Sequence, residues 1–144
     1  MVAQDGSSAG ARELPLVLVV EDDPETRHFY TLTLAANGFD TEEAHNGFQA
    51  WDKATAILPD LILSDIAVPG IDGIEFCRRL RADPRTAPIP ILAVTGYDHR
   101  HYPDRVMDAG ADRVLIKPVT AEVLLSEARR LLRPRREIRD RSIA

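Results

Sequence analysis

The amino-acid sequence predicts an α/β fold in which five strands form a parallel sheet covered by helices. Short apolar runs alternate along the chain with segments whose apolar residues recur at helical spacing. The runs at 14–20, 61–63 and 89–95 are apolar almost throughout, which is typical of parallel strands buried on both faces. The connections between these runs are long enough to hold helices, as parallel neighbours require.

The predicted strands span residues 14–20, 39–44, 61–65, 89–95 and 113–116. The first strand stops at three consecutive acidic residues, Glu21, Asp22 and Asp23. The third ends at Asp65, before a turn rich in proline and glycine. Segment 39–44 alternates only weakly between polar and apolar residues, so we expect it at an edge of the sheet.

The predicted helices span residues 24–37, 47–58, 73–82, 102–109 and 121–133. Pro24 suits the first turn of a helix and Gly38 suits its end. Because proline disrupts a helix interior, the fourth helix is expected to begin at Tyr102 or Pro103 after a loop. Thr120 is a good N-cap for the last helix.

Apolar spacing also predicts which side of four helices faces the core. The residues expected to point inward are Phe29, Leu32 and Ala36 in the first helix; Phe48, Trp51, Ala54 and Ile57 or Leu58 in the second; Ile74, Phe76 or Cys77, and Leu80 in the third; and Val123 or Leu124, Leu125, Ala128, Leu131 and Leu132 in the last.

Length and composition favour one globular domain. The chain has 144 residues, of which 44% are hydrophobic and 28% charged, and its net charge of −5 argues against generic binding to polyanions. The single cysteine, Cys77, cannot form an internal disulfide and is expected to be a small buried side chain in a reducing compartment. Neither a signal peptide nor a membrane-spanning run is recognised, so we expect a cytoplasmic protein without a membrane partner. We divide the chain into a flexible leader (1–13), one domain (14–133) and an arginine-rich tail (134–144).

Polar residues stop four of the predicted strands at one rim of the sheet: Glu21 with Asp22, Asp65, Thr95 and Lys117. Carboxylates gathered without a counterion repel one another, and an all-oxygen ligand set without His or Cys suits Mg²⁺. A carboxylate, a hydroxyl group, a lysine and a metal are the parts needed to accept a phosphoryl group. A lone Asp65 would be interpreted as a turn residue, so the prediction depends on the whole set.

The four motifs VLVVEDDPETR, LILSDIAVPGIDG, ILAVTG and VLIKP, in this order, resemble the receiver domains of bacterial response regulators over roughly residues 14–133. The resemblance implies a doubly wound, flavodoxin-like sheet with strand order 2-1-3-4-5. It also implies a signalling domain that is not an enzyme beyond slow loss of its own phosphoryl group.

Carried over residue by residue, the family's phosphoryl acceptor is Asp65. Its metal ligands are Glu21, Asp22, Asp65 and the backbone carbonyl of Ala67, and the metal is Mg²⁺. The switch hydroxyl is Thr95, and the phosphate-binding lysine is Lys117, whose peptide bond to Pro118 is usually cis in such domains.

The resemblance implies a histidine kinase or histidine phosphotransfer protein as donor and an unidentified protein as downstream partner. A homodimer through the fourth helix, fifth strand and fifth helix is a further possibility, and nucleic acid is not favoured. Two features depart from the family pattern: Val114 stands where many members carry Tyr or Phe, and Pro103 lies in the fourth helix. Ala67 and Tyr97, which flank the acceptor and the hydroxyl, predict slow self-dephosphorylation.

Two other classes remain open. A Mg²⁺-dependent phosphatase-like hydrolase would use similar residues, but its nucleophile is expected after the first strand rather than after the third. A scaffold of the same fold that works without phosphorylation would not need Asp65. We interpret His99 and His101 as solvated loop residues rather than metal ligands, and Arg129–Arg141 as a solvated helix face and tail rather than a nucleic-acid site.

Overall fold

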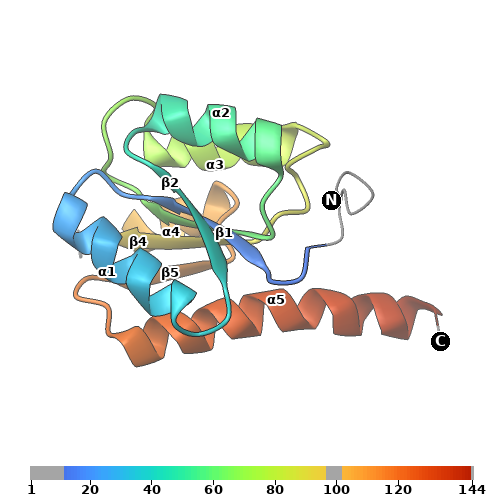
Figure 1. The fold of residues 1–144 in the computed structure, drawn as a ribbon. Coiled ribbons are helices and arrows are strands. Elements are labelled where there is room, and N and C mark those ends of the chain that lie inside the picture. Colours follow the sequence, from blue (N-terminus) through green and yellow to red (C-terminus); the bar gives the residue numbers. More distant parts are fainter. Residues whose placement is uncertain (1–11, 97–101, 144) are drawn as a thin grey trace.

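The protein is a three-layer sandwich with a parallel sheet between two layers of helices (Figure 1). The computed structural model describes residues 12–96 and 102–143, with side chains described as far as Leu132. The five strands are β1 (Leu16–Val20), β2 (Asp40–Ala44), β3 (Leu61–Asp65), β4 (Ile91–Thr95) and β5 (Arg113–Ile116). Their order is β2-β1-β3-β4-β5 and all four pairings are parallel, which confirms the predicted fold class and the edge position of β2.

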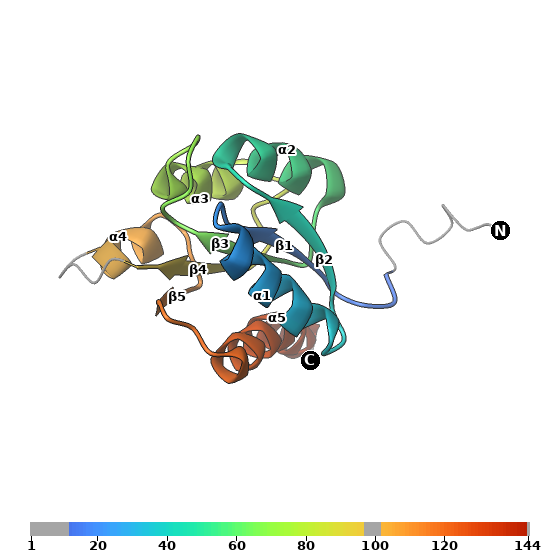
Figure 2. The same cartoon turned by 60° about the vertical axis from the view of Figure 1, so that its left-hand side comes forward.

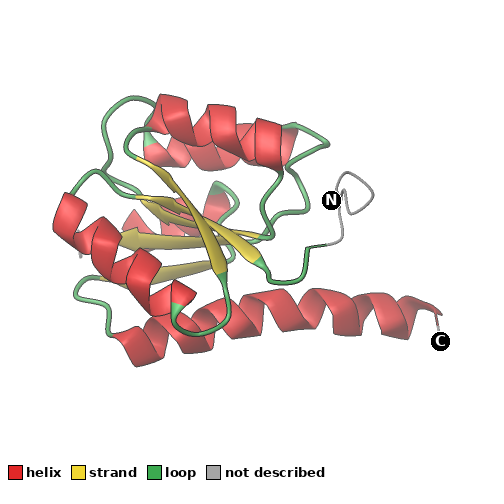
Figure 3. Cartoon of the chain, in the orientation of Figure 1, coloured by secondary structure: helices red, strands yellow, loops and turns green. Residues whose placement is uncertain are grey.

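Five helices alternate with the strands and divide between the two faces of the sheet (Figures 2 and 3). They are α1 (Pro24–Ala35), α2 (Gly47–Ile57), α3 (Gly73–Ala82), α4 (Tyr102–Asp108) and α5 (Ala121–Ile143). Helices α1 and α5 lie together on one face, and α2 and α3 lie on the other, next to α4. The predicted start of α4 at Tyr102 is confirmed.

Neighbouring strand residues point to opposite faces, so the sheet separates two hydrophobic clusters. In β1, Leu18 and Val20 join the cluster under α2, α3 and α4, whereas Val17 and Val19 join the cluster under α1 and α5. Every residue of β1, β3 and β4 is buried, as expected for strands covered by helices on both sides.

The predicted inner face of α1 is wrong by about one residue. Phe29 and Leu32 are 40% and 56% exposed, whereas Tyr30, Thr31 and Leu34 are buried. Two overlapping apolar pairs stand at helical spacing in this segment, Phe29 with Leu32 and Tyr30 with Leu34. The second pair packs against the sheet.

The predicted inner face of α2 is also partly wrong. Phe48 is 64% exposed and Leu58 41%, while the small residues Gly47, Ala50 and Ala54 are buried. Small side chains allow this helix to approach the sheet closely, so its bulkier residues lie at the margin. Trp51 packs partly against the core as expected, and the buried residues of α3 confirm its predicted face.

The bounds of the last helix need a larger correction. The predicted end at Arg133 is wrong, because α5 continues to Ile143 and extends past the other elements in Figure 1. Five of the eleven residues from Arg133 to Ile143 are arginine, which favours helix, and the single proline removes one backbone donor. Within α5, Leu124 and Ala128 are fully buried, and Val123 is 43% exposed.

Other sequence expectations have mixed outcomes. The first strand begins at Leu16 and the fourth at Ile91, after Pro15 and Pro90, which lack the backbone donor that a ladder uses. Arg12, in the expected leader, donates hydrogen bonds to the carbonyl oxygens of Ile57 and Leu58. Cys77 is buried as predicted, and burial raises the pKa of its thiol to about 11. In the described part of the chain, no helix is both long and apolar enough to span a membrane.

Gly73 fixes the loop that follows β3, which yields a test of the fold. A Cβ atom at Gly73 would lie 2.5 Å from the carbonyl oxygen of Ile66 and 2.7 Å from its Cα. Gly73→Ala should therefore destabilise the protein by about 1–3 kcal/mol, because backbone must move. The measurement is urea unfolding, with Gly96→Ala as control because a Cβ there meets no atom within 4 Å. Equal unfolding midpoints for the two variants would contradict the prediction.

Candidate functional site

Register places the polar ends of the strands beside one another. Val20 of β1 is opposite Ser64 of β3, so the residues that follow them, Glu21 and Asp65, emerge at the same level. On the other side of β3, Asp65 is opposite Val94, and Thr95 follows. Thr95 is in turn opposite Ile116, which precedes Lys117. The predicted rim residues thus share one edge of the sheet.

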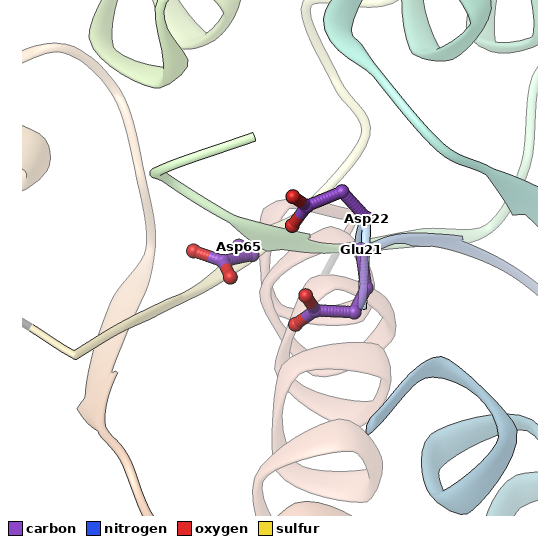
Figure 4. Close-up of side chains that lie close together, drawn as sticks. All are labelled: Glu21, Asp22 and Asp65. Carbon is purple, nitrogen blue, oxygen red and sulfur yellow. The ribbon is translucent and has the colours of Figure 1, made fainter. Parts of the chain in front are cut away.

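Three carboxylates point into the same space at this edge (Figure 4). Glu21 and Asp22 come from the end of β1, and Asp65 comes from the end of β3. One oxygen of each lies within 4.8 Å of an oxygen of the others. Glu21 and Asp65 are buried, whereas Asp22 is exposed, so the cluster is open to solvent on the side of Asp22.

Lys117 joins the two buried carboxylates. Its ammonium group donates to Oδ2 of Asp65 at 2.8 Å and to Oε1 of Glu21 at 3.1 Å. Burial acts to lower the pKa of Lys117, but the hydrogen bonds to Asp65 and Glu21 outweigh it and raise the pKa above its usual value. The ammonium group therefore stays charged throughout the neutral pH range. The peptide bond from Lys117 to Pro118 is cis, as the resemblance implied.

Glu21 is the most enclosed of the acidic residues, with 1% of its surface exposed. Its Oε2 accepts a hydrogen bond from the backbone N–H of Asp23 at 3.1 Å. Burial raises the pKa of Glu21, and the bonds from Asp23 and Lys117 oppose this effect only in part. A buried carboxyl group with a raised pKa gains most from a cation beside it, because the cation offsets the cost of desolvating the charge.

Both oxygens of the Asp65 side chain have partners. Oδ2 contacts Lys117, and Oδ1 accepts a hydrogen bond from the backbone N–H of Ala67 at 2.9 Å. The backbone of the loop after β3 therefore folds back over the Asp65 carboxylate. Thr95 is completely buried at the end of β4, one position beyond the residue that faces Asp65.

The chemistry of the donor set fits a small divalent cation. Three carboxylates and one ammonium group leave two negative charges uncompensated within the described cluster. All the ligand atoms are oxygens, which suits a hard ion that keeps some of its waters. Glu21, Asp22 and Asp65 would hold the ion, and the Ala67 carbonyl stays a proposed ligand.

Sequence reasoning missed two roles next to the cluster. Asp23 is the N-cap of α1, and its side chain accepts a hydrogen bond from the backbone N–H of Thr26 at 2.9 Å. Its position directly before Pro24, the first residue of the helix, could have indicated this role. Arg27 donates to the carbonyl oxygen of Glu21 at 2.8 Å, a contact that no residue pattern reveals.

A cavity of about 500 Å³ adjoins the cluster between α1 and the segment after β5. Its lining includes Lys117 itself, the aromatic rings of Phe29 and Tyr30, and Pro118. Tyr30 is buried, and burial raises the pKa of its phenol to about 12, so this hydroxyl group is neutral at physiological pH. The cavity extends from the side of Lys117 to the rings of Phe29 and Tyr30.

The remaining candidates lie apart from the cluster or outside the described residues. Tyr97, His99 and His101 fall in the segment that the structure does not describe. Val114 is partly buried in β5 and packs against the cluster under α2, α3 and α4.

The contacts of Lys117 predict a large loss of stability when its charge is removed. Lys117→Met should lower the free energy of unfolding by about 2 kcal/mol without divalent cations, because Glu21 and Asp65 would lose their shared partner. This value is below the roughly 3–5 kcal/mol expected for fully buried pairs, because 29% of the Lys117 side chain is exposed. Urea unfolding gives the value, and Lys53→Met, which breaks an exposed ion pair with Glu42, should cost less. A larger loss for Lys53→Met would contradict the prediction.

Comparison with known proteins places this site in a family. Residues 17–129 match the response regulator receiver domain. The chain is 37% identical over 120 residues to the DNA-binding dual master transcriptional regulator RpaA of Synechocystis sp., covering 83% of this chain and 50% of that protein. It is 39% identical over 117 residues to the response regulator MprA of Mycobacterium tuberculosis, covering 81% of this chain and 50% of that protein. The chain thus spans about half the length of the curated relatives it matches.

Solved structures agree with the sequence relatives. The chemotaxis response regulator CheY4 of Vibrio cholerae superposes with a TM-score of 0.78 at 31% identity, covering 83% of this chain and 99% of that one. The BeF3-activated N-terminal receiver domain of Klebsiella pneumoniae RstA gives 0.76 at 31% identity, covering 82% and 98%. The chain therefore belongs to the receiver domains of two-component response regulators.

Proposed function

We propose that this chain accepts a phosphoryl group on Asp65 from a phosphohistidine donor, with Mg²⁺, and that the modification switches a protein–protein interaction. The observation that carries the proposal is the placement of the Asp65 carboxylate. It lies at the end of a buried strand, in contact with Lys117 and within 4.8 Å of the acidic pair Glu21 and Asp22. We place the receiver domain at residues 14–133, between the leader at 1–13 and the tail at 134–144.

In the proposed reaction, an oxygen of Asp65 attacks phosphorus while the phosphorus–nitrogen bond of the donor breaks and the imidazole keeps the electron pair. The ammonium group of Lys117, which lies 2.8 Å from Asp65, would bind an oxygen of the transferred phosphoryl group and balance its negative charge. Thr95 is proposed to donate a hydrogen bond to another phosphoryl oxygen. Glu21, Asp22 and Asp65, with the Ala67 carbonyl, would hold Mg²⁺, which would further neutralise the phosphoryl oxygens.

The donor is proposed to be a histidine kinase or a histidine phosphotransfer protein. The cavity beside Lys117 supports this proposal, because it joins the reacting edge to the exposed ring of Phe29 on α1. A partner that places an imidazole at Asp65 needs such an apolar surface next to the charged cluster.

The output is proposed to leave through α4, β5 and α5, either to another protein or to a second copy of the chain. Among the side chains that the structure describes, each of these elements exposes one large apolar residue: Met107 at 43%, Ile116 at 38% and Val123 at 43%. A phosphoryl group on Asp65 would draw Thr95 and Lys117 toward it, and these residues end β4 and directly follow β5. The charge change at the edge is thereby linked to the proposed surface.

The first test is phosphoryl uptake. Incubation with acetyl phosphate and Mg²⁺ should add one phosphoryl group to the protein, and Asp65→Asn should abolish the addition because its amide is no nucleophile. Intact mass spectrometry gives the stoichiometry, and Asp52→Asn, an exposed position on α2, is the control that should still be labelled. Labelling of the Asp65 variant would reject the assignment. Turnover of many equivalents would instead favour a hydrolase, and an unlabelled wild type would favour a scaffold.

The second test addresses the metal. Asp22→Ala should weaken Mg²⁺ binding and lower phosphoryl uptake together, because it removes the exposed ligand of the proposed site. Amide chemical shifts of Asp65 and Ala67 followed during a MgCl₂ titration give the affinity. A variant that binds Mg²⁺ as the wild type does would place the ion elsewhere.

A further inference from the structure

Arg27 connects the edge strand β2 to the backbone of the two acidic residues. Its Nη1 donates to the carbonyl oxygen of Glu21 at 2.8 Å and lies 3.5 Å from the carbonyl oxygen of Asp22. Its Nε donates to Oε1 of Glu43 at 2.9 Å. Only 13% of the Arg27 side chain is exposed, although it belongs to the first turns of α1 at the surface.

Two consecutive residues of β2, Glu43 and Ala44, thus hold the backbone N–H and C=O groups of Glu21, Ala44 directly and Glu43 through Arg27. The N–H of Glu21 donates to the carbonyl oxygen of Ala44 at 3.0 Å. The carbonyl oxygen of Glu21 accepts from Arg27, which Glu43 holds. The two peptide units on either side of Glu21 are therefore held in place, and the second of them ends at the Cα atom of Asp22.

We propose that Arg27 is a positioning residue for the metal site and that Glu43 is its anchor. The inference rests on the proposed function, because it assumes that Glu21 and Asp22 hold Mg²⁺. A small ion demands near-ideal ligand geometry, so a rotation of either peptide unit would move a carboxylate out of place. The planar guanidinium group suits this task, since it bonds Glu43 and a carbonyl group through different nitrogens at fixed angles.

The effect of the Arg27 charge and the effect of its hydrogen bonds change Mg²⁺ affinity in opposite directions, so an experiment can distinguish them. If Arg27 acted only through its positive charge, it would repel a divalent cation, and its removal would strengthen Mg²⁺ binding. If Arg27 holds the two peptide units, its removal weakens Mg²⁺ binding. Loss of a group that orients metal ligands typically reduces affinity by roughly 10–100-fold.

The experiment measures Mg²⁺ affinity by titrating amide chemical shifts with MgCl₂ for four proteins. Arg27→Gln should bind Mg²⁺ about tenfold more weakly than the wild type. Arg27→Lys keeps the charge but lacks the fork, so it should also bind more weakly. Arg79→Gln removes the same charge from an exposed ion pair on α3 and should bind as the wild type does. Thermal unfolding without metal identifies the temperature at which all four are folded, and the titrations are run below it.

Unchanged or stronger Mg²⁺ binding by Arg27→Gln would overturn the inference, as would wild-type affinity in Arg27→Lys. If Arg27→Gln does not fold, the conservative Arg27→Lys decides the matter alone. Failure of the proposed function has a different signature: the wild type would bind no Mg²⁺, or Asp22→Ala would bind it normally. The two proposals can therefore fail separately.

Discussion

Parallel register is the constraint on which the rest of this structure depends. Because β1, β3, β4 and β5 are parallel and end within about one residue of each other, the polar residues at their carboxyl ends meet at one edge. Glu21 and Asp65 are brought together in this way, although they lie 44 positions apart in the chain. A slip of β3 by one residue would turn its side chains to the opposite faces, so that Ser64 or Ile66 would take the place of Asp65 at the site. The hydrophobic pattern that fixes the sheet therefore also fixes the chemistry.

At that edge the protein keeps an unfavourable set of charges in place. Burial of Glu21 and Asp65 costs free energy, and Lys117 offsets part of it through two hydrogen bonds. A cation bound among the carboxylates would neutralise the remaining negative charge. Binding of a metal by these carboxylates would relieve part of this cost of folding and would link the stability of the protein to occupancy of the site.

The fold and the rim residues could be predicted from the sequence because apolar runs that stop at a polar residue define strand ends. The end of β3 at Asp65 is an example. Both bounds of α3 were predicted as well. Helix faces were harder to predict where large and small apolar residues compete. In α2 Ala50 and Ala54 face the core and Phe48 faces solvent, because the distance to the sheet is set by tertiary packing. Arg27 was beyond reach, since its partners at Glu21 and Asp22 are backbone carbonyl groups, which every residue has.

The acidic residues of β2 have one more consequence, for how copies of the protein can meet. An open strand edge is a template for pairing with another chain, and charged side chains are a common protection against it. Glu42 pairs with Lys53 of α2 and Glu43 with Arg27 of α1, so this short edge is lined by ions held on both faces of the sheet. At the opposite edge, β5 has only four residues and begins with Arg113, which is exposed. Growth of the sheet across molecules is therefore disfavoured at both ends, and crowding in a cell should produce contacts through helices instead of β-sheet aggregation.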